Sequence, residues 1–182
     1  MLDIENTSLA VIDVQGKLSG LIHDHEKVQT HIGYFILAAK SFNLPILWSE
    51  QAPDKIGGTI KPIKELLDPV AKPIAKRSFS CWGEPAYVKH LQKINRRQIL
   101  ITGIEAHVCV YQTAHDLSRH GYEVHLVADA TSSRKALDRD TAIERMRAEG
   151  MVITTTEMAM CELIKTADHP EFKSVVSHLK RR

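Results

Sequence analysis

The chain has 182 residues, of which 43% are hydrophobic and 25% are charged. This length predicts a single domain over residues 1–182 with a substantial core, and the composition excludes a disordered chain. The formal net charge is +2, and the one basic cluster is the run at 180–182. Because a terminal basic run is typical of a solvated end, we expect no nucleic acid as a partner.

Cysteine usage and the N-terminal residues predict a cytoplasmic protein. The cysteines are Cys81, Cys109 and Cys161, and no two share a C-x-x-C spacing, which argues against a secreted disulfide framework. Residues 1–5 contain acids and no signal-type apolar region. No run approaches the ~18 apolar residues that span a bilayer, so we expect no membrane partner.

Taken in order, the chain alternates short apolar runs with helical patterns. Residues 8–14 form a nearly continuous apolar run that ends in an acid, typical of a strand buried on both faces. Apolar residues then recur at helical spacing from about 25 to 43, where Pro45 prevents continuation. Further strands are expected at 45–50, 98–104, 122–128 and 151–155, with a short extended piece at 70–75. Further helices are expected at 60–67, 84–95, 107–120, 138–149, 157–164 and 170–179, and a loop at 51–60.

This alternation predicts right-handed crossovers and a parallel sheet covered by helices on both faces. In such sheets the ligand site lies beyond the carboxyl ends of the strands. Asp13, Lys76, Glu105 and Cys109 all lie at or just after such ends. Residues distant in the sequence are therefore expected to meet at one edge of the sheet.

Cys109 is the candidate nucleophile. It follows a buried strand and falls in the expected first helical turn, where the helix dipole and unpaired N–H groups favour the thiolate. The same N–H groups could hold the oxyanion formed by attack on a carbonyl. The alternative is that Cys109 is a small buried hydrophobic residue, as most free cysteines are.

Asp13 and Lys76 favour the catalytic interpretation. Asp13 can accept the thiol proton and return it to a leaving amine, while Lys76 can hold positive charge beside both groups. Cys109 then attacks and forms a covalent intermediate. The ordinary alternatives are a salt bridge or helix cap for Asp13 and a surface position for Lys76.

Several separated motifs resemble the isochorismatase-like cysteine hydrolases. Residues 103–110 resemble the nucleophile motif, 11–15 the first-strand aspartate motif and 76–80 the lysine motif. Residues 127–134 and 154–157 also match, and the resemblance covers about 8–179. It is closest to the short isochorismatase-domain-containing proteins.

The resemblance implies a three-layer α/β/α sandwich with a parallel, Rossmann-like sheet of about six strands. It implies Asp13, Lys76 and Cys109 as the catalytic triad. It also implies a non-proline cis peptide between Ile104 and Glu105, which would aim the Glu105 N–H at the point faced by the Cys109 N–H to form the oxyanion hole. An ordinary trans turn is the alternative.

The chain also departs from its relatives. The nicotinamidase branch carries an Asp-x-His metal motif after the second strand, but residues 48–55 contain no histidine, so we expect neither a metal nor a cofactor. The isochorismate-cleaving branch does not rely on a cysteine. Trp48, Phe79 and Trp82 are candidates for the pocket wall, with core packing as the alternative for each.

The leading hypothesis is a metal-independent cysteine hydrolase that acts on a small carbon–nitrogen substrate, such as an amide, through a thioester. The alternative is a catalytically silent ligand-binding or scaffolding member of the same fold. A third hypothesis is redox sensing by a low-pKa Cys109. The expected partners are a small-molecule substrate and further copies of the chain, since closed symmetric assemblies are common.

Overall fold

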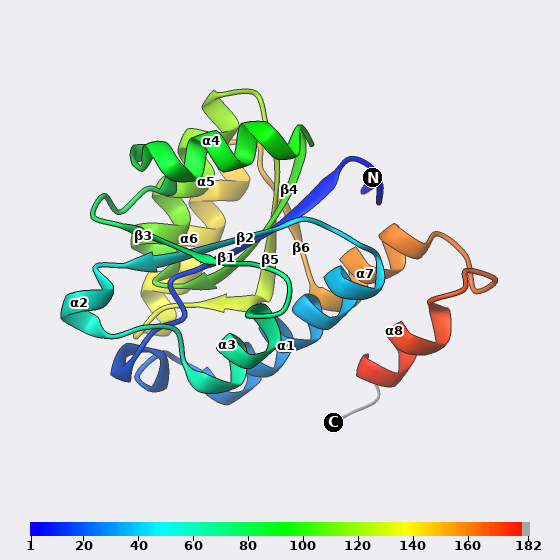
Figure 1. Ribbon diagram of the computed structural model, residues 1–182, viewed down its shortest axis with the longest axis horizontal. Coiled ribbons are helices and arrows are strands. Elements are labelled where there is room, and N and C mark those ends of the chain that lie inside the picture. The colour runs from blue at the N-terminus through cyan, green and yellow to red at the C-terminus, as the bar shows by residue number, and fades with distance from the viewer. Residues whose placement is uncertain (180–182) are drawn as a thin grey trace.

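The computed structural model describes residues 1–179, so the basic run at 180–182 lies outside the described residues. Within this range, six strands form one parallel sheet in the order β3-β2-β1-β4-β5-β6 (Figure 1). The strands are β1 (Thr7–Ile12), β2 (Ile46–Gln51), β3 (Pro73–Lys76), β4 (Gln98–Ile104), β5 (Glu123–Ser132) and β6 (Val152–Thr154). The sheet confirms the predicted fold class.

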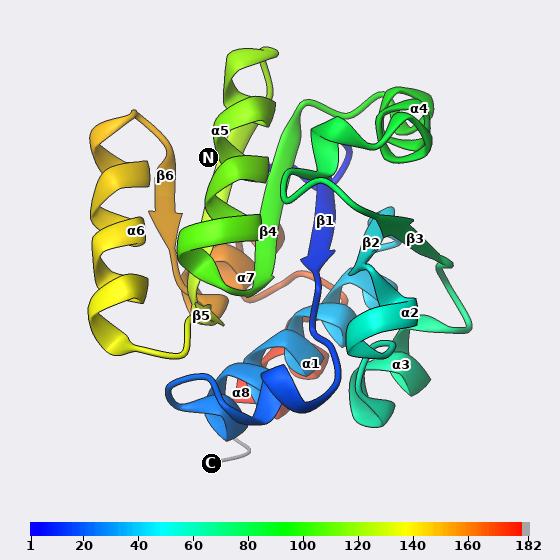
Figure 2. The same cartoon turned by 90° about the vertical axis from the view of Figure 1, so that its left-hand side faces the viewer.

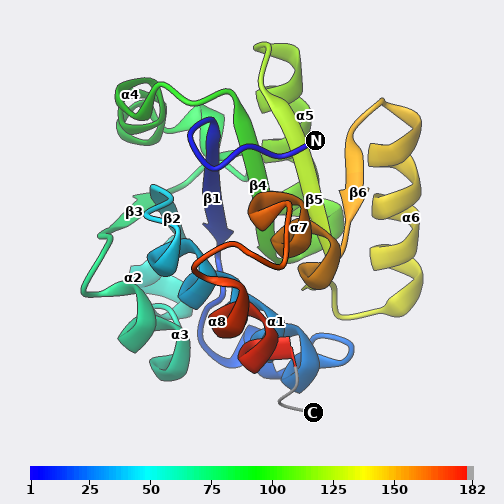
Figure 3. The same cartoon turned by 90° about the vertical axis from the view of Figure 1, so that its right-hand side faces the viewer.

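Helices cover both faces of this sheet (Figure 2). One face carries α1 (His25–Ser41), α3 (Lys61–Leu67), α7 (Thr156–Ile164) and α8 (Phe172–Leu179). The other face carries α4 (Pro85–Ile94), α5 (Tyr111–Arg119) and α6 (Ala136–Ala148). Figure 3 shows α7 and α8 beside α1, which both of them contact. The short helix α2 (Pro53–Ile56) and the 3-10 turns η1 (Lys17–Gly20) and η2 (Cys81–Gly83) lie in the connections.

The central strands are apolar because both of their faces are covered. Every residue of β1 and of β4 is buried. Leu9 and Val11 contribute to the core beneath α1, while Ala10 and Ile12 contribute to the core beneath α4 and α5. A nearly continuous apolar run is the pattern expected of such strands, because successive side chains enter opposite cores.

Three elements differ from the sequence-based prediction. The expected loop at 51–60 contains α2, whose Pro53 occupies the first helical turn, a position that proline tolerates well. β5 continues past Ala128 to Ser132. The expected helix at 107–120 is divided into a π-helical turn, η3 (Ala106–Val110), followed by α5.

The extension of β5 coincides with a shift in its pairing with β4. Ile101 pairs with Leu126, but Gly103 pairs with Thr131, so β4 advances two residues while β5 advances five. Such irregularities often redirect a strand end near a functional site. Among residues 1–179, no helix is both long and apolar enough to cross a membrane.

Candidate active site

Asp13 and Lys76 form a buried ion pair at the carboxyl ends of β1 and β3. Lys76 Nζ donates a hydrogen bond of 2.6 Å to Asp13 Oδ2. The lysine and aspartate side chains are 0% and 5% exposed, so solvent screens their attraction only weakly. The other carboxylate oxygen, Asp13 Oδ1, accepts a hydrogen bond of 2.7 Å from the Ser49 hydroxyl. The carboxylate is therefore held from both sides.

Further acceptors hold the Lys76 ammonium in place. It donates to Gln51 Oε1 at 2.7 Å, to the Phe79 carbonyl at 2.9 Å and to the Ser78 carbonyl at 3.3 Å. The strand register explains this meeting, because Gln51 is paired with Lys76 across β2 and β3. Similarly, Ser49 is paired with the residue that precedes Asp13.

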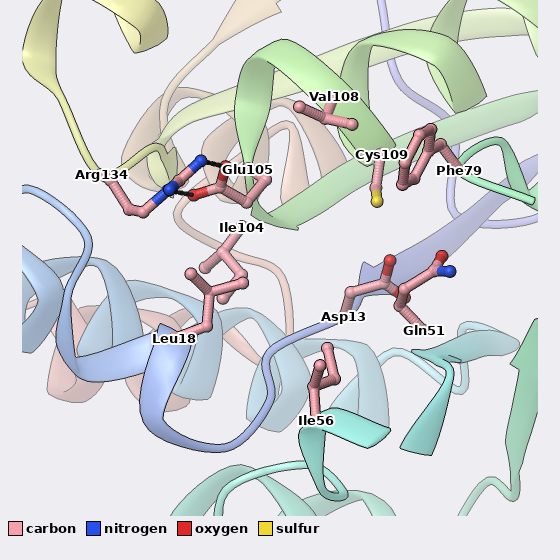
Figure 4. A pocket seen from close by; sticks show the side chains of 10 residues that line it. All are labelled: Asp13, Leu18, Gln51, Ile56, Phe79, Ile104, Glu105, Val108, Cys109 and Arg134. Carbon is pink, nitrogen blue, oxygen red and sulfur yellow. Dashed lines mark hydrogen bonds and ion pairs between the residues drawn. The ribbon is translucent and has the colours of Figure 1, made fainter. Parts of the chain in front are cut away.

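Cys109 lies in the π-helical turn between β4 and α5, where the Val110 N–H donates to the Glu105 carbonyl, five residues earlier, at 3.4 Å. The Cys109 side chain points toward Asp13 (Figure 4), and the charge of Asp13 acts on the sulfur. The structure thus brings the three predicted residues together at one edge of the sheet.

The expectation that the site favours a Cys109 thiolate is wrong. Burial raises the pKa of the Cys109 thiol from 9.0 to about 12, and the negative charge of Asp13 adds to the increase, whereas Lys76 lowers the pKa. The ammonium is already paired with Asp13, so its effect on the sulfur is outweighed. Because the redox-sensing hypothesis depended on a low pKa, the raised pKa removes its basis.

The predicted cis peptide between Ile104 and Glu105 is also wrong, since the bond is trans. Glu105 instead adopts a left-handed conformation, with φ 59° and ψ 62°, which turns the chain from β4 into η3. Just before it, Gly103 has φ +141°, and a Cβ there would lie 2.3 Å from the Ile12 carbonyl oxygen. Glycine therefore permits the close approach of β1 and β4 beside Asp13.

The Glu105 side chain forms an ion pair with Arg134, which follows β5. Arg134 Nε lies 3.2 Å from Glu105 Oε1, and Arg134 Nη2 lies 3.3 Å from Glu105 Oε2. The glutamate side chain is 9% exposed and the arginine side chain 57% exposed. His107 Nε2 lies 3.7 Å from Glu105 Oε2, and the other ring nitrogen of His107 is hydrogen bonded to Ser133.

A cavity of about 260 Å³ opens beside the sulfur. Figure 4 shows the side chains of its wall, which are Asp13, Leu18, Gln51, Ile56, Phe79, Ile104, Glu105, Val108, Cys109 and Arg134. Phe79 is therefore placed in the wall. No group of three or more His, Cys, Asp or Glu side chains in the described part of the chain is arranged to hold a metal ion.

The two tryptophans proposed for the pocket wall lie elsewhere. Trp48 is 1% exposed in the core beneath α1, and its indole N–H donates to Thr59 Oγ1 at 2.8 Å. Trp82 stacks on His120, with ring centroids 3.8 Å apart. Neither is among the residues that line the cavity, so these two expectations are corrected.

Sequence reasoning missed Ser49, Gln51 and the side-chain role of Arg134. Ser49 and Gln51 alternate at the end of β2, so they project from the same face of the strand, and this alternation could have identified them as neighbours of Asp13. Arg134 closes the matched segment 127–134. Its pairing with Glu105 depends on the register shift in β5, which no local pattern reveals.

The raised thiol pKa values predict a loss of stability at alkaline pH. Burial raises the pKa of Cys81 to about 11 and that of Cys109 to about 12, both from 9.0. Between pH 9.0 and those values the unfolded chain loses thiol protons that the folded chain retains, so unfolding becomes more favourable as pH rises. Urea unfolding at a series of pH values should show this decline.

A matched variant separates the Cys109 contribution from other alkaline effects. Cys109→Ser carries a hydroxyl that does not ionise in this range, so its stability should fall less steeply above pH 9.0. Cys161→Ser is the comparison, because burial raises the pKa of this exposed thiol less than that of Cys109, so its removal should reduce the decline less. Equal slopes for the parent chain and Cys109→Ser would contradict the raised pKa.

Comparison with known proteins places this chain in a family. A family model described as the isochorismatase domain matches residues 7–158. Isochorismatase family protein 1B of Dictyostelium discoideum is 35% identical over 181 residues, covering 98% of this chain and 88% of that protein.

Solved structures agree with this match. The structure described as the MAR1 ribonuclease of Caenorhabditis elegans has a TM-score of 0.89 and 35% identity, covering 98% of this chain and 91% of that chain. The YcaC gene product of Escherichia coli, described as an octameric hydrolase of unknown specificity, has a TM-score of 0.90 and 26% identity, covering 97% of this chain and 89% of that chain. The family model, the sequence relatives and the shared sheet lead to one conclusion: this chain belongs to the isochorismatase-like hydrolase family.

Proposed function

We propose that this protein is a cysteine hydrolase that cleaves the carbon–nitrogen bond of a small amide-type substrate without a metal. The observation that carries the proposal is the buried Asp13–Lys76 pair beside Cys109, at 2.6 Å between Nζ and Oδ2. This arrangement supplies a nucleophile, a neighbouring carboxylate that can act as its base and a third group that orients the carboxylate. It opens onto a cavity of substrate size.

The first step transfers the Cys109 thiol proton to Asp13 as the sulfur attacks the substrate carbonyl carbon. The negative charge passes from the carboxylate to the sulfur and, as the carbon–sulfur bond forms, to the substrate oxygen, so the net charge of the site with its substrate does not change. A buried site therefore avoids the large cost of holding an additional uncompensated charge. This explains how a thiol with a raised pKa can serve as the nucleophile.

The attack forms a carbon–sulfur bond and a tetrahedral oxyanion. The backbone N–H of Cys109 stabilises this oxyanion. The trans Ile104–Glu105 bond removes the reason for assigning the Glu105 N–H to the same point. Asp13 then gives its proton to the leaving nitrogen, the carbon–nitrogen bond breaks, and ammonia or an amine departs from a thioester. In the second half, Asp13 takes a proton from water, whose hydroxide attacks the thioester carbonyl. The carboxylic acid leaves as the proton returns to the sulfur.

The test is a screen of small primary amides and imides for ammonia release, with rapid acid quenching and mass spectrometry of the Cys109 peptide. A substrate should leave an acyl mass on Cys109, and Cys109→Ala should lower turnover by about a thousandfold or more. Cys161→Ala, the same change at an exposed cysteine, should hydrolyse the substrate at the parent rate. Parent-rate hydrolysis by Cys109→Ala would end the proposal.

A silent ligand-binding protein is the second candidate, and the protonated Cys109 thiol favours it, because a neutral thiol is a weak nucleophile. It predicts a small ligand that binds tightly, no acyl adduct in the screen and no ammonia. Because one relative is described as a ribonuclease, the screen includes a short RNA. Cleavage of that RNA that depends on Cys109 would replace the amide assignment.

Two further expectations remain proposals. The description of the E. coli relative as octameric supports assembly of this chain with copies of itself, which sedimentation would measure. A cytoplasmic location stays a prediction from cysteine usage.

A further inference from the structure

We infer that the cavity selects uncharged substrates: small amides whose acyl group is apolar and carries neither a carboxylate nor an ammonium group. This inference rests on the proposed function for its chemistry. It is carried by a separate observation, which is the way the charged groups of the cavity wall are paired with one another.

The Glu105–Arg134 pair neutralises one side of the cavity. Both guanidinium contacts, at 3.2 Å and 3.3 Å, are made to the two oxygens of one carboxylate. Glu105 is nearly buried, while Arg134 reaches the solvent at the cavity mouth. An arginine in this position could bind a substrate carboxylate bidentately, but Glu105 already occupies it in that way. A substrate anion would have to displace a carboxylate that belongs to the protein.

The other polar side chains of the cavity wall are also bonded to groups within the protein. Asp13, the other acid of the wall, is paired with Lys76. Gln51 uses both ends of its amide, because Oε1 accepts from Lys76 and Nε2 donates to the Arg77 carbonyl at 2.9 Å. Among the residues that line the cavity, each charged group therefore has a partner of opposite charge within the protein.

The rest of the wall is apolar and sets the size of the acyl group. Leu18, Ile56, Phe79 and Val108 line the cavity together with these polar side chains (Figure 4). A cavity of about 150 Å³ holds a benzene-sized ligand, so the volume of about 260 Å³ suits a substrate of about ten non-hydrogen atoms. A charged acyl group would lose its hydration among these side chains without gaining a partner.

A first experiment measures charge selectivity without requiring turnover. Iodoacetamide and iodoacetate alkylate thiols by the same chemistry but differ in charge, and mass spectrometry gives their rates at Cys109 at about pH 8. The exposed Cys161 is an internal reference. The rate ratio of neutral to anionic reagent should be about tenfold higher at Cys109 than at Cys161.

Variants that remove one charge then test whether the Glu105–Arg134 pair causes this selectivity. Glu105→Gln leaves Arg134 without its carboxylate, so the ratio at Cys109 should fall at least about fivefold. Glu65→Gln makes the same change in an exposed ion pair with Lys61 outside the cavity wall, so the ratio should not change. A ratio at Cys109 equal to that at Cys161, or one that Glu105→Gln does not move, would overturn the inference.

A second experiment compares amides of matched shape. Levulinamide and succinamate differ by a methyl group in place of a carboxylate oxygen, and hexanamide and 5-aminopentanamide differ by a methyl in place of an ammonium. The parent enzyme should prefer the neutral member of each couple by about tenfold in kcat/KM. Arg134→Gln leaves Glu105 unbalanced and should shift the preference toward 5-aminopentanamide, whereas Glu105→Gln should shift it toward succinamate.

The two experiments distinguish a failure of the proposed reaction from a failure of the proposed charge selectivity. If no amide is hydrolysed but alkylation keeps its charge selectivity, the proposed reaction is wrong and the selectivity stands. If amides are hydrolysed and succinamate is preferred to levulinamide, the proposed reaction stands and the neutral substrate class is overturned.

Discussion

We expect Asp13→Asn to abolish amide hydrolysis while making the Cys109 thiol more acidic. The amide side chain of Asn cannot accept the thiol proton, so turnover should fall by about a thousandfold or more. The same change removes the negative charge that raises the pKa of Cys109 and leaves Lys76, which lowers that pKa. The variant should therefore have a lower thiol pKa than the parent value of about 12.

The pH dependence of iodoacetamide labelling at Cys109, read by mass spectrometry, measures this shift. Asp116→Asn is a useful control because Asp116 accepts a hydrogen bond from Ser80 at 2.6 Å and is not part of the cavity wall. The usual association of a more acidic thiol with a more active enzyme would be reversed here. A variant in which activity persists, or in which the thiol pKa rises, would contradict the role given to Asp13.

The second large effect is expected from Lys76→Met. This change removes the cation from a carboxylate that is 5% exposed and leaves Asp13 buried without its counter-charge. Breaking a buried pair in this way typically costs about 3–5 kcal/mol of the free energy of unfolding. Urea unfolding of the parent and the variant measures the loss, and amide turnover should disappear with it.

A double variant tests whether the cost arises from the unpaired charge. Asp13→Asn combined with Lys76→Met has no buried charge at this position, so it should be more stable than Lys76→Met alone even though it has lost both native side chains. Lys64→Met, which breaks an exposed pair with Asp68, should change the free energy of unfolding by less than about 1 kcal/mol. A double variant less stable than Lys76→Met would contradict this account.

The strands were predictable because burial on two faces leaves a strong local pattern. The run at 98–104 predicts β4 with its observed bounds, Gln98–Ile104, and the alternation of strands and helices predicts the parallel sheet. β5 was less predictable. Beyond Ala128 three of its four residues are polar, and Asp129 accepts hydrogen bonds from the N–H and hydroxyl of Thr156, so the extended segment lacks the continuous apolar signature of a buried strand.

The electrostatics of the site could not be predicted from spacing. Position near a helix start indicates a thiolate for Cys109, but the pKa depends on burial and on which partner Lys76 already holds. The Ile104–Glu105 peptide illustrates the same limit. The resemblance implied a cis bond, whereas the structure turns the chain with a trans bond and a left-handed Glu105. The thiol pKa depends on Asp13, which follows β1 and is distant from Cys109 in the sequence.

The reacting side chains and the arginine of the cavity wall lie on different parts of the sheet, and this separation affects how a new substrate specificity could arise. The acid, the amine and their supporting side chains lie on one side of β4: Asp13 directly follows β1, Ser49 and Gln51 belong to β2, and Lys76 ends β3. Arg134 lies on the other side of β4, after β5. Replacing Arg134, whose side chain is 57% exposed, would alter which molecules are admitted while leaving the reacting groups undisturbed. Laboratory evolution for a different substrate should therefore begin at Arg134 and the exposed Lys135 that follows it, where variants should stay folded and reactive.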